Sequence, residues 1–168
     1  MRYRIQPGRR AVSEADLADL RAVPARLAEA VGERLYARDL ACQRLGIHLE
    51  GIGPGHARMS MVVRSDMLNG HGNCHGGFIF ALADSCFAYA CNSRNQNTVA
   101  SAGAIDFLAP AAGEERLIAE CAEQSLAGRT GVYDVLVTGE GGRQVALFRG
   151  KSHRVAGAVL PEPDPGTP

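Results

Sequence analysis

The run of residues that decides the fold is FIFALADSCFAYAC, which spans residues 78–91. It lacks glycine and proline, contains four alanines and is longer than an ordinary strand, so it predicts a helix. Because the run is apolar on almost every side, we expect that helix to be buried on almost every side. Asp84 is the exception, since burying a carboxylate is costly unless it is paired, hydrogen-bonded or open to a wet cleft. Such an acid is either catalytic or a structural group satisfied by backbone amides, and the first interpretation is favoured.

A glycine-rich segment, NGHGNCHGG, leads into this helix at residues 69–77. Its four glycines allow the backbone to approach a ligand closely. Gly76 and Gly77 are expected in the first turn of the helix, where N–H groups lack intrahelical partners and carry the positive end of the helix dipole. Such amides can hold a carbonyl oxygen that gains negative charge, or a phosphate. A plain glycine-rich loop is the alternative interpretation.

The spacing between the Gly76 amide and the Asp84 carboxylate also predicts that the protein assembles from more than one chain. Gly76 and Asp84 are eight positions apart, which is about 12 Å along a helix axis. One carboxylate therefore cannot act on a carbonyl that is held at the start of its own helix. Two copies packed antiparallel about a two-fold axis would bring Gly76 near the partner's Asp84. The sequence thus predicts a homodimer with two shared sites as the active unit.

Several blocks of the sequence together resemble the hotdog-fold acyl-CoA thioesterases, and within that family the thioesterases of bacterial phenylacetic acid degradation. The matching blocks are residues 67–71, 74–77, 82–84, 87–93, 100–101, 105–108, 130–135 and 145–154. The resemblance covers about residues 25–157. It departs from the family pattern at Ala109, where an arginine is expected before Pro110.

The resemblance implies an α+β hotdog fold, an antiparallel sheet of five to six strands wrapped around a long central helix. It implies hydrolysis of an arylacetyl-CoA, such as phenylacetyl- or hydroxyphenylacetyl-CoA, to the free acid and CoA in phenylacetate catabolism. The active homodimer would pair into a dimer of dimers, a homotetramer. No cofactor is needed, because the thiolate is already a good leaving group.

Four residues form the expected catalytic group: Asp84, Gly76, His75 and Asn69. Asp84 would activate water as a general base or attack the thioester directly. The Gly76 amide, with that of Gly77, would polarise the thioester carbonyl. His75 would orient the loop or meet the thioester sulfur, and Asn69 would position a water or the carbonyl.

The last predicted strand has one face that changes character along its length. Val145, Leu147, Arg149, Lys151 and His153 alternate on that face, which begins apolar and ends cationic. Arg149, Lys151 and His153 can bind the phosphates of coenzyme A. An ordinary solvated sheet face is as compatible with the spacing, and the resemblance favours the ligand.

Other interpretations of these residues remain open. His71, Cys74 and His75 lie in one loop without the four spaced ligands of a zinc site, so no metal is expected. Asp106, near a strand end, is expected to be structural. A hotdog 3-hydroxyacyl dehydratase is a rival function, although the loop lacks the Phe-Pro-Gly-His-Pro pattern of those enzymes. A non-catalytic acyl-CoA binding protein is another, although it would need no acid beside the amides.

Composition bounds the class of protein. The chain has 168 residues, which fits one domain, and 18 basic residues balance 18 acidic ones. No bulk attraction to nucleic acid or to an anionic membrane is expected. Five cysteines and no recognisable signal segment predict a cytoplasmic protein with reduced thiols. The longest apolar run is too short and too broken to span a bilayer.

The remaining pattern predicts the order of elements. Residues 1–24 form an N-terminal extension with a helix capped by Ser13 and ending near Arg21. The hotdog domain, residues 25–157, begins with a helix over 26–45. Strands are expected at residues 47–52, 57–63, 98–108, 116–125, 131–138 and 144–155. Residues 158–168 form a proline-rich tail that is expected to be disordered.

Overall fold

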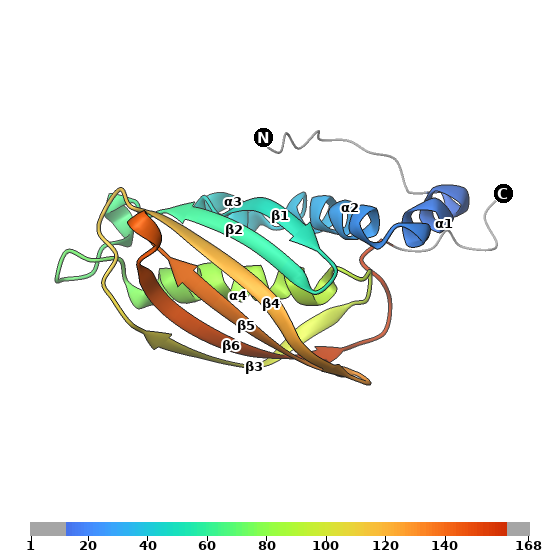
Figure 1. Ribbon diagram of the computed structural model, residues 1–168. Helices are drawn as coiled ribbons and strands as arrows, with labels where there is room; N and C mark the ends of the chain where they lie inside the picture. The colour runs from blue at the N-terminus through green and yellow to red at the C-terminus, as the bar shows by residue number, and fades with distance from the viewer. Residues whose placement is uncertain (1–12, 161–168) are drawn as a thin grey trace.

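A six-stranded antiparallel sheet curves around one long helix (Figure 1). The computed structural model describes residues 13–160, so the expected disorder from Pro161 onward lies outside the described residues. The elements are α1 (Glu14–Ala22), α2 (Pro24–Tyr36), α3 (Leu40–Leu45), β1 (His48–Gly53), β2 (His56–Val62), η1 (Ser65–Met67), α4 (Gly76–Asn92), β3 (Thr98–Phe107), β4 (Arg116–Ala127), β5 (Thr130–Thr138), η2 (Glu140–Gly142) and β6 (Gln144–Arg154). The strand order is β1-β2-β4-β5-β6-β3. The predicted hotdog arrangement is confirmed.

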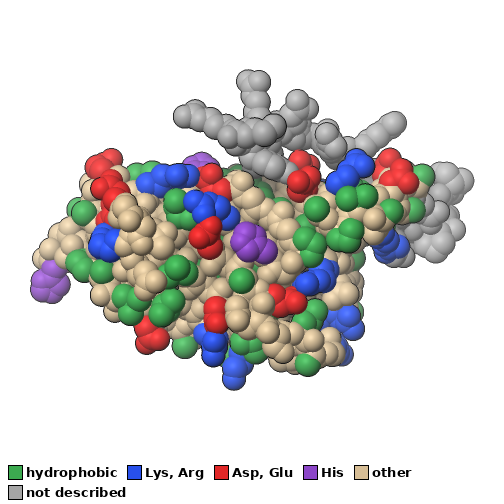
Figure 2. All heavy atoms as spheres, viewed as in Figure 1, with side chains coloured by type: hydrophobic (Ala, Val, Ile, Leu, Met, Phe, Trp, Pro, Cys, Tyr) green, Lys and Arg blue, Asp and Glu red, His purple; other side chains and the backbone are tan. Residues whose placement is uncertain are grey.

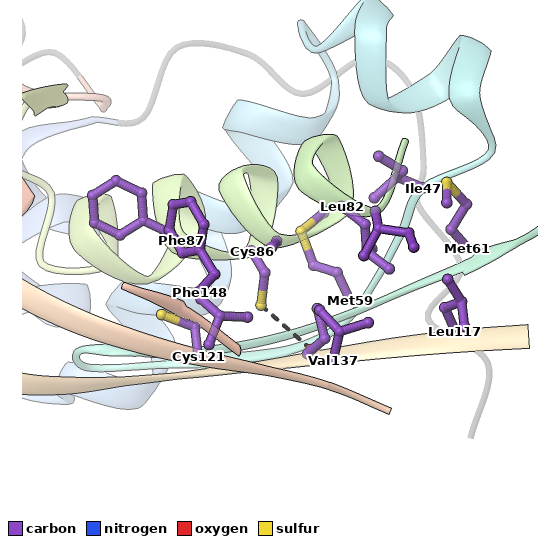
Figure 3. Packing of buried hydrophobic residues seen from close by; sticks show 14 of the residues in the cluster. Ile47, Met59, Met61, Leu82, Cys86, Phe87, Leu117, Cys121, Val137 and Phe148 are labelled. Atoms are coloured by element: carbon purple, nitrogen blue, oxygen red, sulfur yellow. Dashed lines mark hydrogen bonds between the residues drawn. The ribbon is translucent and has the colours of Figure 1, made fainter. Parts of the chain in front are cut away.

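The core lies between α4 and the inner face of the sheet. Figure 3 shows Leu82, Cys86 and Phe87 of α4 against side chains from the strands. The Phe87 ring packs on Tyr133 and Phe148, with centroids 5.5 and 5.9 Å apart. A Cβ at Gly150 would lie 2.9 Å from that ring, so only glycine lets β6 pass this closely. Burial of these rings is a dominant stabilising contribution, since aromatic side chains bury the largest apolar areas.

One strip of α4 is not covered by the sheet. Gly77 is exposed, and Ala81, Asp84 and Ala88 are only half-buried. Their spacing of four, three and four residues places them on one helix face. The expected burial on almost every side is therefore wrong for this strip. The sheet curves around the rest of the helix and leaves a row of small side chains, with one acid, uncovered.

The two edges of the sheet differ. Helix α2 lies along β1 (Figure 1), where Leu49 and Ile52 fill the space beside Gly32. Strand β3, at the other edge, is exposed over most of its ten residues, and Val99 and Phe107 are 49% and 54% exposed. A long exposed edge strand offers unpaired backbone groups to another chain. The uncovered edge of β3 is therefore a surface suited to pairing.

The single helix predicted over residues 26–45 is wrong. The chain leaves the helical path after Tyr36 and starts again as α3 at Leu40. Asp39 causes the new start, because its side chain accepts a hydrogen bond from the Cys42 amide at 2.9 Å. Leu40 is 59% exposed and does not extend the apolar stripe of α2.

The described part of the N-terminal extension, residues 13–24, is packed against the domain. Helix α1 starts as predicted, with the Ser13 hydroxyl accepting from the Asp16 amide. Leu17 is 2% exposed and packs in a second small core with Val31 of α2. No helix within residues 13–160 is long and apolar enough to cross a lipid bilayer.

The C-terminal segment joins the same small core. Val159 and Leu160 are buried there, beyond the boundary predicted at 157. Asn95 fixes the backbone of Leu160 on both sides: its Oδ1 accepts from the Leu160 amide at 2.7 Å, and its Nδ2 donates to the Leu160 carbonyl at 3.2 Å. Val159 and Leu160 are therefore packed with the domain.

Candidate active site

Asp84 lies in the middle of α4, on the strip that the sheet does not cover. Its side chain is half-buried, and no hydrogen bond or ion pair within residues 13–160 reaches its carboxylate. Burial raises the pKa of this carboxyl above its ordinary value of 3.8. The alternative of a structural acid satisfied by backbone amides is not what the described residues show. An unpaired carboxylate with a raised pKa is suited to accept a proton.

The first turn of α4 offers one free amide. His75 caps the helix, and its Nδ1 accepts a hydrogen bond from the Gly77 amide at 3.1 Å. The Gly77 amide is therefore occupied, whereas the Gly76 amide has no hydrogen-bond acceptor among residues 13–160. Since Nδ1 is an acceptor, the imidazole proton of neutral His75 is on Nε2. The exposed His75 ring can thus donate outward from beside the free amide.

The glycine-rich loop, residues 69–77, extends from the body of the molecule (Figure 1), and hydrogen bonds join its two sides. Asn69 closes it: its amide donates to the Asn73 carbonyl at 2.8 Å, and its Oδ1 accepts from the amides of His71 and Asn73. Gly72 has φ +78°, which glycine adopts without strain. The Oδ1 of Asn69 is therefore committed to the loop, whereas its Nδ2 has no hydrogen-bond partner among residues 13–160.

Phe107 lies directly over the start of α4. Its ring carbons are 2.9–3.3 Å from the position that a Cβ on Gly76 would occupy. A side chain at position 76 would therefore displace the exposed Phe107 ring. Because Phe107 is 54% exposed and is the last residue of β3, the free amide lies next to the uncovered edge of the sheet.

A single chain does not bring the amide and the acid together. Gly76 and Asp84 belong to one continuous helix with no break between them. Eight residues of α-helix separate them by about 12 Å. The distance inferred from the sequence therefore holds in the folded chain.

The predicted cationic residues lie on the outer face of the sheet, away from α4. Leu147, Arg149, Lys151 and His153 are exposed, whereas Val145 is buried beside a register shift between β5 and β6. Figure 2 shows basic and acidic side chains close together over the surface of the molecule. The alternation is therefore confirmed from residue 147 onward.

Arg149 is already paired. Its Nε and Nη2 donate to the two oxygens of Asp134 at 2.6 and 2.7 Å. This hydrogen-bonded guanidinium lowers the pKa of Asp134. Lys151 and His153 have no side-chain partner within residues 13–160. Of the three predicted cations, these two are the ones available to an anion.

The structure adds three arginines that sequence reasoning missed. Arg94, Arg129 and Arg154 line a narrow hollow near the C-terminal end of α4, with buried Ser152 on its wall. Arg129 lies in the β4–β5 turn and donates from Nε and Nη2 to the Arg154 carbonyl at 2.9 and 2.8 Å. Only the hairpin register places this turn against the end of β6, so their spacing in sequence gave no signal.

The remaining candidates do not form a second centre. Within residues 13–160, no three His, Cys, Asp or Glu side chains are placed to hold a metal ion. Cys74 is buried, and burial raises the pKa of its thiol to about 11, so it stays protonated near neutral pH. Asp106 is exposed on the outer face of β3, opposite Leu147, and it does not face the α4 strip.

Comparison with known proteins gives one consistent family. The thioesterase superfamily model matches residues 71–146. The chain is 44% identical over 128 residues to the acyl-coenzyme A thioesterase PaaI of Escherichia coli (strain K12), covering 76% of this chain and 91% of that protein. The solved structure of E. coli PaaI, from the phenylacetic acid degradation operon, has a TM-score of 0.79 and 42% identity, covering 80% and 97% of the two chains. The solved structure of a mutant of the phenylacetic acid degradation protein PaaI from Thermus thermophilus has a TM-score of 0.66 and 40% identity, covering 68% and 98%.

Asp84→Asn tests the electrostatic state of the acid. Because the folded pKa is raised, the unfolded chain ionises first as pH rises above about 3.8, and folding stability is lost between that pH and the folded pKa. The variant should therefore be more stable than the parent at pH 7, and the difference should shrink towards pH 4. Urea unfolding of both proteins at the two pH values measures it. A difference independent of pH would instead reflect packing.

Proposed function

The chain belongs to the thioesterase superfamily, and we propose that it hydrolyses the thioester of an arylacetyl-CoA, such as phenylacetyl- or hydroxyphenylacetyl-CoA, to the free acid and CoA. The observation that carries this proposal is one helix with a free amide at its start and an unpaired, half-buried Asp84 on its uncovered face. The choice of acyl group is supported by 42% identity to a protein from the phenylacetic acid degradation operon of E. coli.

The proposed active unit is a homodimer built on the uncovered strip of α4 and the edge of β3. Antiparallel packing of two α4 helices would cover Ala81 and Ala88, and would place the Gly76 amide next to the partner's Asp84. Edge-to-edge pairing of two β3 strands would satisfy their exposed backbone groups and bury Val99 and Phe107. Two such dimers then pair into a tetramer, as the family resemblance implies.

In the proposed reaction, the Gly76 amide donates to the thioester oxygen and stabilises the charge that develops on it. The partner's Asp84 activates a water that attacks the carbonyl, or attacks it directly to give an anhydride that water then hydrolyses. The coenzyme leaves as its thiolate. His75 donates from Nε2 towards the sulfur or the carbonyl, and the Asn69 Nδ2 holds the water or the acyl group.

The coenzyme phosphates are proposed to bind around the end of β6. There Lys151 and His153 lie on the outer face, and Arg154 and Arg129 lie around the hollow on the α4 side. Asn92, the last residue of α4, is about 12 Å along the helix axis from Asp84, and Arg94 follows it with its guanidinium already paired to Glu123. An extended pantetheine arm can bridge such a separation, so the thioester and the phosphates can be bound at once.

The proposal places the enzyme in the cytoplasm. All five cysteines are free and buried. Reduced thiols are the usual state there, whereas secreted domains of this size tend to use cysteines in disulfides.

Thiol release from a panel of acyl-CoA esters tests the function. Phenylacetyl-CoA should be hydrolysed, and Asp84→Ala should lower turnover by at least ~100-fold, the scale of losing a general base. Asp19→Ala, the same change on exposed α1, is the matched control and should retain full activity. Dehydration of a 3-hydroxyacyl thioester would indicate the dehydratase, and binding without thiol release would indicate the binding protein. Either result would contradict the proposal.

A second experiment compares Lys151, which has no side-chain partner within residues 13–160, with Arg149, which is paired with Asp134. Lys151→Ala should raise KM for the CoA ester about tenfold, because a phosphate loses a charged partner. Arg149→Ala should have a smaller effect, since Asp134 already holds that guanidinium. Neither change should alter KM for a truncated thioester without the nucleotide. If Lys151→Ala affects both substrates equally, the lysine has a structural role.

The shared site is tested by blocking the edge of β3. Ala104→Lys places a charge on this edge in both chains, which should convert the dimer into a folded, inactive monomer. Ala122→Lys on the interior strand β4 is the control and should remain dimeric and active. Light scattering and thiol release, measured over a range of protein concentrations, should show activity returning only as dimers form. An active monomer would show that the site lies within one chain.

A further inference from the structure

We infer that Glu115, held by Arg143, is a positioning residue for the Gly76 amide. This inference rests on the proposed function. It concerns the loop between β3 and β4, residues 108–115. The Glu115 carboxylate binds one side of this loop, and the glycine-rich loop, residues 69–77, binds the other side.

Glu115 and Arg143 hold this loop from one side. Glu115 is 6% exposed, and its Oε2 accepts from the Ala112 amide at 2.9 Å. Its Oε1 accepts from the Glu140 amide at 3.0 Å. Arg143 donates from Nη2 to both oxygens, at 2.6 and 2.9 Å, and from Nη1 to the Pro110 carbonyl at 2.7 Å. The carboxylate and its arginine therefore fix the backbone of the loop at two residues.

The same loop holds the start of α4 from the other side. Ala111, between those two fixed residues, is fully buried, and its carbonyl accepts from the Cys74 amide at 2.8 Å. Cys74 precedes Gly76 by two residues. Phe107, where the loop begins, covers Gly76 itself. A short chain of hydrogen bonds thus runs from the Glu115 carboxylate to the segment that carries the free amide.

Two further features indicate that the loop is held firmly. Glu114 has φ +65°, a left-handed conformation that is unfavourable for a residue with a side chain and persists only where the surroundings impose it. Burial alone would raise the pKa of Glu115, but the amides of Ala112 and Glu140 and the Arg143 guanidinium lower it overall. The carboxylate therefore stays charged, and its hydrogen bonds stay charge-assisted, at neutral pH.

The expected consequence is kinetic. An amide that stabilises a developing oxyanion must be placed closely, and a shift of about 1 Å can lower the rate ~100-fold. Substrate binding depends on other contacts, mainly those of the coenzyme. Weakening the Glu115 contacts should therefore lower kcat and leave KM nearly unchanged.

The test uses Glu115→Gln in the full-length protein, with Glu120→Gln as the matched control. The new side-chain NH2 faces backbone and guanidinium donors and cannot accept from them. Glu120 forms an ion pair with Arg58 on the outer face of the sheet. It is not part of the chain of hydrogen bonds that leads from Glu115 to Cys74. We expect Glu115→Gln to lower kcat about tenfold with KM for phenylacetyl-CoA within twofold, and hydrogen exchange of the Cys74 amide to become faster. The control should change neither quantity.

Arg143→Lys provides a second variant if the first does not fold. It keeps a positive charge and loses the two-pronged contact to Glu115 and Pro110, so it should show the same kcat effect. If hydrogen exchange of the Cys74 amide becomes faster in a variant and kcat is unchanged, the inference is overturned. It is also overturned if the exchange rate of that amide does not change. If the unmodified enzyme releases no thiol, the proposed function fails, and the exchange measurement still tests whether Glu115 holds the loop.

Discussion

The structure depends on how much of one helix a sheet can cover. Helix α4 is apolar enough to need burial along most of its circumference, and the six strands curve around it to provide that burial. They do not close, so a strip of small residues and the outer edge of β3 remain uncovered. The groups of the proposed site lie on or beside that uncovered part: the amide of Gly76, the ring of Phe107 and the carboxylate of Asp84.

The same helix is the reason that we propose a second chain. Its positive end is at Gly76, and its acid is two turns further along, beyond the first turn, where a carboxylate could itself accept from a backbone amide. His75 illustrates this competition: its ring already accepts the Gly77 amide and leaves only the Gly76 amide free. A carbonyl held at Gly76 is therefore out of reach of its own Asp84. Antiparallel association of two α4 helices would bring each Gly76 amide near the partner's Asp84, and it would also cover the exposed strip of small residues. We therefore propose that one interface does both.

Sequence reasoning reached the features set by local periodicity and missed those set by tertiary register. The apolar run at residues 78–91 predicted the helix, and the alternating strands predicted the sheet, whereas the uncovered face that carries Asp84 depends on how far the sheet curves around the helix. The break at Asp39 was missed because the apolar spacing on both sides of it is compatible with one continuous helix. A single capping side chain is a weak signal against that pattern. The pairing of Arg149 with Asp134 depends on which residues of β5 and β6 lie opposite each other. Glu115 and Arg143 are likewise 28 residues apart and meet only in the folded chain.

Two carboxylates show how one fold assigns opposite roles to the same chemical group. Glu115 is more deeply buried by exposed fraction, yet it accepts hydrogen bonds from two amides and a guanidinium, and its pKa is lowered. Asp84 accepts no hydrogen bond from residues 13–160, and burial raises its pKa. Donors, and not depth of burial, therefore decide which acid is fixed as an anion and which is ready to take a proton. Because no group within residues 13–160 donates to Asp84, partial burial alone sets the direction of its pKa shift, which supports the general base that we propose it to be.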